Sequence, residues 1–80
     1  MNESDPVRDL LVEFFQLPPA TPASELAQSS VAQWDSLAMV QLIAELQSVF
    51  GVVFELDEIE RLTSYAEIRA ALARRGAVSL

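Results

Sequence analysis

The sequence predicts an all-α protein: a small four-helix bundle with three main helices, a short third helix and a long loop between helices I and II. Apolar residues recur at helical spacing in three separate stretches. One strand-like stretch has no second strand pattern with which to pair. The chain has 80 residues, of which 51% are hydrophobic, enough for one small core. We therefore expect a single domain over residues 1–80.

The first helix is predicted from Pro6 to about Gln16. Asp5 is a good N-cap, because its carboxylate accepts hydrogen bonds from free backbone N–H groups, and proline is favoured at the first helical position. An apolar stripe follows at positions i, i+3, i+4 and i+7. Its members are Val7, Leu10, Leu11 and Phe14.

Residues 17–34 are predicted to form a long loop. Three prolines and several polar residues interrupt any regular pattern, and Leu26 and Val31 stand as isolated apolar anchors. The pattern leaves open whether this loop is ordered or disordered. Loops of this length inside compact domains are uncommon and often functional. Trp34, near its end, is expected to anchor the loop against the core.

The second helix is predicted to begin at Asp35 or Ser36, either of which can cap it, and to end at Phe50 before Gly51. At about 100° per residue one face is apolar. That face holds Met39, Leu42, Ile43, Leu46, Val49 and Phe50, with Val40 at its edge. The opposite face holds Leu37, Ala38, Gln41, Ala44, Glu45 and Ser48. Leu37 is thus expected to face solvent, with packing against Trp34 as the alternative.

Residues 52–56 look strand-like, but a lone strand cannot satisfy its own backbone, so we expect an extended connection. Asp57 is predicted to cap a single helical turn that carries Ile59 and Leu62.

The last helix is predicted to begin with the capping box Ser64 to Glu67 and to end at Gly76, with cations in its final turn. Its inward residues are expected to be Tyr65, Ile68, Ala71 and Leu72, and the final-turn cations are Arg74 and Arg75.

Composition excludes many catalytic classes. The chain has no cysteine, no histidine and only two glycines. It therefore has no disulfide, no thiolate or imidazole metal site, no cysteine or histidine catalysis and no glycine-rich phosphate loop. Most classes of small enzyme are thereby excluded. We expect no catalytic residue, no metal site and a protein that is not itself an enzyme.

The charge balance disfavours polyanionic partners. Twelve acidic residues oppose five arginines, which gives a net charge of −7. Nucleic acids and anionic membrane surfaces both attract clustered cations, which this chain lacks. The first residues are acidic, unlike a signal peptide, and no apolar run approaches the roughly 20 residues that span a bilayer. We expect a soluble cytoplasmic monomer.

Asp35-Ser36-Leu37, at the start of a helix that follows a long loop, resembles the attachment motif of the acyl carrier protein family. This tripeptide alone is common. The resemblance also covers the Phe50-Gly51 end of the second helix, the short helix near residues 57–59 and the entry to the last helix at residues 62–65. Because these features occur together over nearly the whole chain, the resemblance is specific.

The resemblance implies that Ser36 is the covalent attachment point of a 4′-phosphopantetheine arm whose thiol carries an acyl-type substrate as a thioester. It implies that Asp35 helps a phosphopantetheinyl transferase to place magnesium and coenzyme A, although Asp35 could act only as a helix cap. It implies that Leu37 enters an apolar pocket on partner enzymes. Further partners would be acyl or aminoacyl ligase or transferase enzymes. An aminoacyl or peptidyl carrier and an unmodified helical interaction module are the alternatives.

Two surfaces are candidates for docking partners. The first is the exposed face of the second helix, with Leu37, Ala38, Gln41, Ala44 and Glu45. The second is the acidic cluster, which is either a solvated face or a docking site for basic surfaces. It consists of Glu55, Asp57, Glu58 and Glu60. Members of the family that act in fatty acid synthesis display several acidic residues along the exposed face of the second helix. In this chain Glu45 is the one acidic residue on that helix after Asp35. This difference favours a carrier of a specialised pathway.

Overall fold

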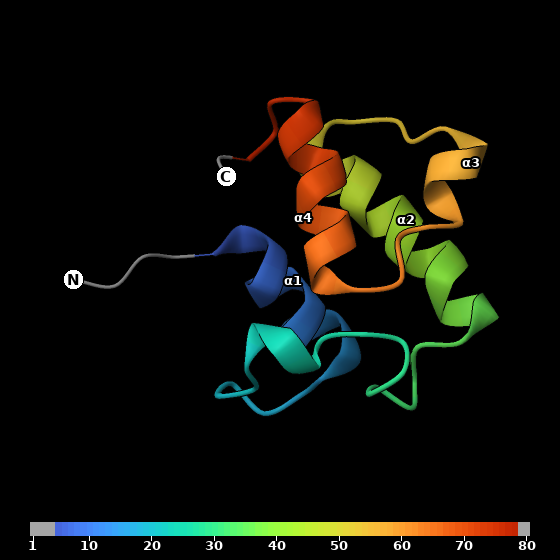
Figure 1. Ribbon diagram of the computed structural model, residues 1–80. Helices are drawn as coiled ribbons and strands as arrows, with labels where there is room; N and C mark the ends of the chain where they lie inside the picture. Colours follow the sequence, from blue (N-terminus) through green and yellow to red (C-terminus); the bar gives the residue numbers. More distant parts are fainter. Residues whose placement is uncertain (1–4, 79–80) are drawn as a thin grey trace.

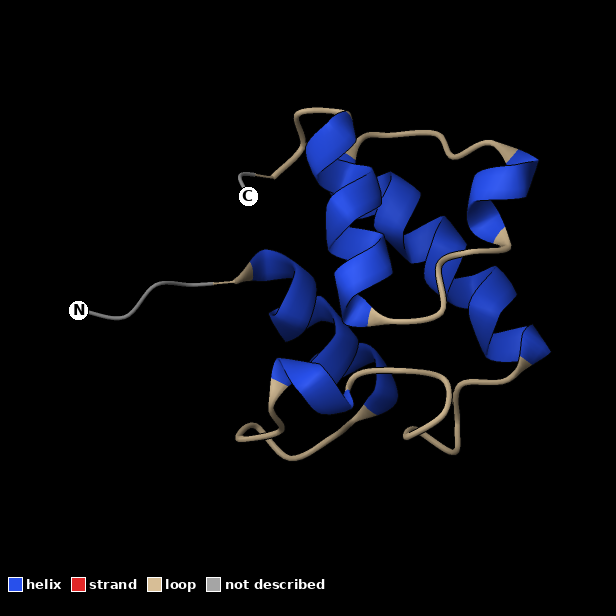
Figure 2. Cartoon of the chain, viewed as in Figure 1, coloured by secondary structure: helices blue, strands red, loops and turns tan. Residues whose placement is uncertain are grey.

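The computed structural model describes residues 5–78, which form four α-helices and one 3-10 turn without any strand (Figures 1 and 2). The elements are α1 (Pro6–Phe15), the turn η1 (Ala23–Glu25), α2 (Ser36–Phe50), α3 (Leu56–Ile59) and α4 (Tyr65–Arg74). The predicted all-α fold, with three main helices and a short third helix, is confirmed. Residues 1–4, which include the acidic Glu3, lie outside the described residues.

One hydrophobic core joins the three long helices. Helix α4 contacts both α1 and the turn η1, while α3 lies at the margin of the bundle (Figure 1). The helices contribute Val7, Leu11, Phe15, Leu42, Ile43, Leu46, Ile68, Ala71 and Leu72 to the buried set. The connecting segments add Leu26, Val31, Trp34, Phe54 and Leu62. The loops therefore take part in the core, and the three anchors predicted in the long loop are confirmed.

Helix α1 begins as predicted. The Asp5 carboxylate accepts hydrogen bonds from the backbone N–H groups of Val7 and Arg8, each at 3.2 Å. Asp5 also accepts a hydrogen bond from the Tyr65 hydroxyl, which joins the start of α1 to the start of α4. The helix ends at Phe15, and Gln16 adopts a left-handed conformation with φ of 54° as its C-cap. The predicted end at about Gln16 is thus correct to within one residue.

The long loop follows a defined path because polar groups attach it to the helices. The Arg8 guanidinium donates hydrogen bonds to the Thr21 carbonyl at 3.1 and 3.3 Å and also to the Pro19 carbonyl. Further along, the Tyr65 N–H donates to the Leu26 carbonyl at 2.7 Å. These bonds pin the loop at both α1 and the beginning of α4, so the ordered alternative is the one observed.

Helix α2 confirms most of the predicted apolar face. Leu42, Ile43 and Leu46 are buried, and Met39 and Phe50 are half-buried. Val49 was placed on this face, and that prediction was wrong, since its side chain is 56% exposed. At about 100° per residue Val49 lies farther from the centre of the buried stripe than Phe50 does, and it falls in the last turn. Gly51, with φ of 65°, then ends the helix as expected.

The prediction that Asp57 caps the short helix was wrong. Helix α3 begins at Leu56, so Glu55 occupies the capping position and Asp57 lies inside the first turn. The backbone N–H of Glu55 donates to the Glu58 carboxylate at 3.2 Å, a pairing of residues three apart that defines this helix start. Residues 52–55 form the extended connection that was predicted. At α4, the Ser64 hydroxyl accepts from the Glu67 N–H at 3.2 Å, as expected of an N-cap.

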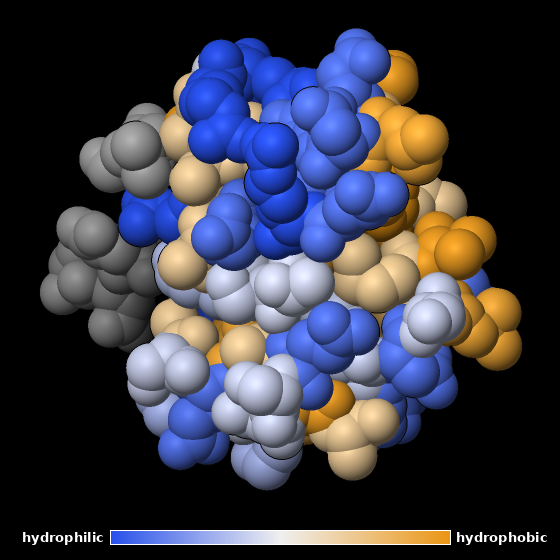
Figure 3. Space-filling model, turned by 45° about the vertical axis from the view of Figure 1, so that its right-hand side comes forward, coloured by the Kyte–Doolittle hydropathy of each residue, from blue (hydrophilic) through white to orange (hydrophobic). Residues whose placement is uncertain are grey.

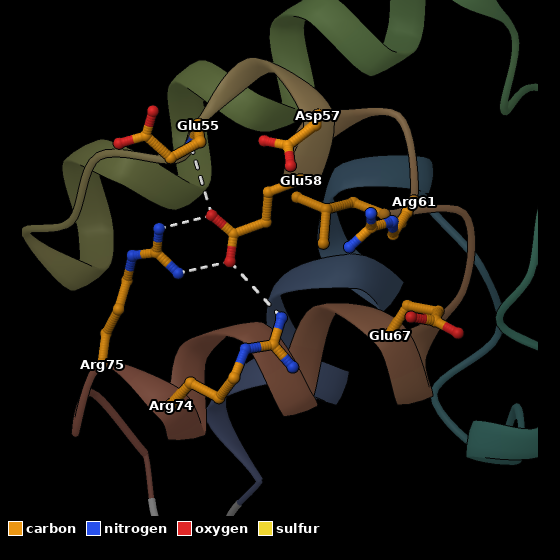
Figure 4. Close-up of a pocket in the computed structure, with 8 residues that line it drawn as sticks. Glu55, Asp57, Glu58, Arg61, Glu67, Arg74 and Arg75 are labelled. Carbon is orange, nitrogen blue, oxygen red and sulfur yellow. Dashed lines mark hydrogen bonds and ion pairs between the residues drawn. The ribbon is translucent and has the colours of Figure 1, made fainter.

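Arg75 holds α3 and the extended connection against α4 (Figure 4). Its guanidinium donates to both carboxylate oxygens of Glu58, at 2.5 Å for Oε2, and Arg74 adds a longer contact at 3.4 Å. It also donates to the Val53 carbonyl at 3.2 Å and lies 5.0 Å from the centre of the Phe54 ring. Hydrogen bonding to Arg75 lowers the pKa of Glu58 from 4.5 to about 2. We call this group of contacts the Arg75 clamp.

Acid should open the Arg75 clamp. Because the pKa of Glu58 is lower in the folded state than in the unfolded state, its contribution to stability is present above pH 4.5 and is lost as the pH falls towards about 2. The stability difference between the wild type and Glu58→Gln should therefore shrink over this range. Urea titration followed by the fluorescence of Trp34 measures it. Glu60→Gln, which removes an exposed carboxylate from the same segment, is the control, and a difference independent of pH would contradict the clamp.

Two leucines on α2 should differ in their contribution to stability. Leu42 is fully buried, so Leu42→Ala should lower the free energy of unfolding by about 2–5 kcal/mol. Leu37 is 67% exposed, so Leu37→Ala should change it by less than about 0.5 kcal/mol. The same urea titration compares the two variants, and equal losses would show that the buried face of α2 is misplaced.

Candidate functional site

Ser36 is the first residue of α2, and its side chain is exposed. Its position is fixed by the preceding loop residues. Trp34 is buried, its ring stacks on Phe15 at 5.0 Å between centroids, and its indole N–H points to the Met39 sulfur. The predicted role of Trp34 as a loop anchor is confirmed. The hydroxyl of Ser36 is thus presented to solvent at a rigidly held helix end.

The start of α2 is a favourable place for an anion. The Asp35 carboxylate accepts from the Ala38 N–H at 2.9 Å, and the Asp35 carbonyl accepts from Met39 at 2.9 Å. Among residues 5–78 the backbone N–H groups of Ser36 and Leu37 have no hydrogen-bond acceptor. These free donors and the positive end of a helix of 15 residues suit a phosphodiester on the Ser36 hydroxyl.

Leu37 faces solvent, as predicted. Its side chain is 67% exposed, so the alternative in which it packs on Trp34 was wrong. Other large apolar side chains are also exposed, and Figure 3 shows apolar surface gathered along one edge of the molecule. They are Val40, Val49, Val53 and Leu56. The sequence pattern missed the exposure of Val53 and Leu56, since neither lies in a long helix with a readable face.

The remaining predicted docking residues of α2 lie on one side of the helix. Gln41, Ala44 and Glu45 are exposed, whereas Ala38 is half-buried and packs against the core. Glu45 is the sole acid of α2 itself. The accessible surface of this helix is therefore mostly small, apolar or amide in character.

The acidic cluster around α3 is not uniformly negative. Glu55, Asp57 and Glu60 are exposed, but the Glu58 side chain is only 12% exposed and is paired with Arg75. Together with Arg61 and Arg74, residues of the cluster line an open pocket of about 430 Å³ (Figure 4). Acidic and basic side chains thus alternate here, and Glu58 already has its ionic partners within the chain.

Two further kinds of site were sought among the described residues. Within residues 5–78 no three histidine, cysteine, aspartate or glutamate side chains gather to hold a metal ion. No helix in this range is long and apolar enough to cross a bilayer.

Comparison with models of known protein families gives a match to this chain. The family model described as phosphopantetheine attachment site matches residues 5–72, a range that includes α1, the long loop, Ser36 and most of α4. Neither the search of curated proteins nor that of solved structures gave a match. The family carries a 4′-phosphopantetheine prosthetic group. The exposed Ser36 hydroxyl and the free N–H groups beside it fit such a group. The chain therefore belongs to the phosphopantetheine attachment family of carrier proteins.

Proposed function

We propose that this protein tethers an acyl-type group as a thioester on a 4′-phosphopantetheine arm attached to Ser36 and presents that group to partner enzymes. The observation that carries the proposal is the exposed hydroxyl of Ser36 at the capped start of α2, inside the range that matches the family. The arm supplies the thiol, which accounts for a carrier chain without cysteine.

Loading of the arm requires one displacement at phosphorus. The Ser36 Oγ forms a bond to the pantetheine-side phosphorus of coenzyme A, and the pyrophosphate bond breaks so that adenosine bisphosphate leaves. The serine proton is proposed to pass to a base of the phosphopantetheinyl transferase. Asp35 lies next to Ser36 with one carboxylate oxygen engaged as the helix cap. We propose that Asp35 also helps the transferase to hold magnesium during this step.

The partner surface is proposed to be the exposed side of α2 with Leu37 as its most apolar member. This surface has small, apolar and amide side chains and little charge. Such a surface supports a dedicated carrier of a specialised pathway, loaded by its own acyl ligase or transferase. The same sparse acidity also favours an aminoacyl or peptidyl carrier as a second candidate. In either case we propose a cytoplasmic monomer that acts as substrate carrier and does not itself catalyse a reaction.

Replacing Ser36 should abolish loading without loss of the fold. Ser36→Ala removes the nucleophilic oxygen, whereas the cap on α2 comes from Asp35 and remains. Intact mass after incubation with coenzyme A and a broad-specificity phosphopantetheinyl transferase should increase by the arm in the wild type alone. Circular dichroism of both proteins should be the same. An arm on Ser36→Ala would contradict the attachment site, and Ser30→Ala, in the preceding loop, is the matched control that should load normally.

Recognition of α2 should depend on its uncharged surface. Ala44→Glu places a charge on the exposed side of α2, so the kcat/KM of loading by the same transferase should fall at least about tenfold, the equivalent of ~1.4 kcal/mol. Ala66→Glu, on the exposed side of α4, is the matched control and should load normally. Raising the salt concentration should have a modest effect, because apolar contact is not screened.

A different docking surface would give the opposite pattern. A steep loss of loading with salt, together with indifference to Ala44→Glu, would mean that the transferase docks on the acidic cluster and not on α2. Charge reversal of Asp57, an exposed member of that cluster, would then reduce loading.

A further inference from the structure

An open groove lies beside the start of α2, on the side that faces α1. Its volume is about 530 Å³. It is lined by Phe14, Phe15 and Gln16 at the end of α1, by Gln33 in the loop, and by Ala38 and Gln41 on α2. None of these residues is charged, although the whole chain carries a net charge of −7. The groove is therefore a neutral site on a strongly acidic protein.

Amide groups dominate the polar lining of this groove. Gln33 donates one hydrogen bond to the Phe15 carbonyl at 3.4 Å, which fixes its amide while leaving its oxygen open. In the described part of the chain the side chains of Gln16 and Gln41 make no hydrogen bond. Each free carboxamide offers both a donor and an acceptor. A ligand that itself carries amides could pair with both the donor and the acceptor of each carboxamide.

The end of α1 adds a further acceptor near these amides. The Phe14 carbonyl would normally accept from the residue four positions later, but that residue is Pro18, which has no N–H. The neighbouring Leu17 N–H donates to the Val12 carbonyl at 2.9 Å, so it does not reach the Phe14 carbonyl either. The Phe14 ring stands edge-on to Phe15, with 4.9 Å between centroids and 84° between planes, and remains half-exposed. An aromatic surface suited to aliphatic groups thus lies at the same helix end.

We propose that this groove, which we call the amide groove, holds the pantetheine part of the arm in the loaded protein. The arm has paired secondary amides and a geminal dimethyl group, which match the carboxamides and the Phe14 ring. The inference rests on the proposed attachment at Ser36.

The amide groove is within reach of the attachment point. Along the axis of α2, at ~1.5 Å per residue, Ala38 lies about 3 Å and Gln41 about 7.5 Å from Ser36. Around the axis Gln41 is roughly 140° from Ser36, so the arm passes over the start of α2 to enter the groove. A short flexible tether gives an effective concentration in the millimolar range. Contacts too weak to bind free pantetheine therefore suffice to hold the attached arm.

The placement leaves the Leu37 side of α2 open. With the arm on the side of α1, the exposed side chains of Leu37 and Val40 stay accessible to a partner. A docked enzyme would then withdraw the arm from the amide groove into its own active site.

Nuclear magnetic resonance of the loaded protein tests the inference. An unlabelled arm is transferred to isotope-labelled protein, and contacts are sought from the geminal methyl protons of the arm. We expect contacts to the Phe14 ring and to the Gln41 side chain, and shifts of the Gln16 and Gln33 amide signals relative to the unloaded protein. Gln41→Ala removes one hydrogen-bonding partner of the arm, so the methyl contacts to the Phe14 ring should weaken at least about twofold. Gln28→Ala, an exposed glutamine outside the groove, should leave them unchanged.

The outcomes separate this inference from the proposed function. Full loading by intact mass, with methyl contacts absent or directed to Val40 and Leu56, would overturn the amide groove and leave the carrier function standing. Equal weakening by Gln41→Ala and Gln28→Ala would also overturn it. Failure of the wild-type protein to gain the arm would overturn the proposed function and, with it, the amide groove.

Discussion

The structure around Ser36, the proposed attachment site, depends on the burial of Trp34. Its ring stacks on Phe15 at the end of α1, and its indole reaches Met39 in the first turns of α2. Because Trp34 is held on both sides, the two residues that follow it have a fixed position, and Asp35 caps α2 at the point where Ser36 begins it. Without Trp34 as an anchor, the end of the long loop, and Ser36 with it, would have no fixed position. The position of the exposed Ser36 side chain is therefore determined by the buried apolar contacts of Trp34.

A second set of contacts maintains the opposite end of the bundle. Residues 52–59 contain few buried side chains, and the Arg75 clamp compensates by joining Glu58, the Val53 carbonyl and the Phe54 ring. The ion pair of Glu58 with Arg75 is accessible to solvent at its edges, so its contribution to the stability of the fold is small. Its main effect is to hold α3 in position. The two regions thus differ in kind: apolar contact fixes the position of Ser36, whereas ionic contact fixes α3.

Much of this could be predicted from local sequence, because local rules decide it. Asp5, Asp35 and Ser64 cap their helices with their own side chains, and Gly51 ends α2 for steric reasons. The errors occurred where tertiary packing decides. Val49 has the hydropathy of a core residue but lies at the edge of the buried stripe, and Glu55, in place of Asp57, occupies the capping position before α3. The ion pair of Glu58 with Arg75, 17 positions apart, and the amide groove between separate segments have no signal in a single sequence.

The most direct test of the account is to locate the phosphodiester within the loaded chain. Fragmentation of the intact loaded protein in the mass spectrometer distinguishes serines by their position, and Ser29 and Ser30 are exposed in the same loop. Among the serines of residues 5–78, only Ser36 combines an exposed hydroxyl with the first position of a helix of 15 residues. We expect every fragment that carries the arm to contain Ser36, and fragments that end before Asp35 to lack it. An arm on Ser29 or Ser30 would contradict it.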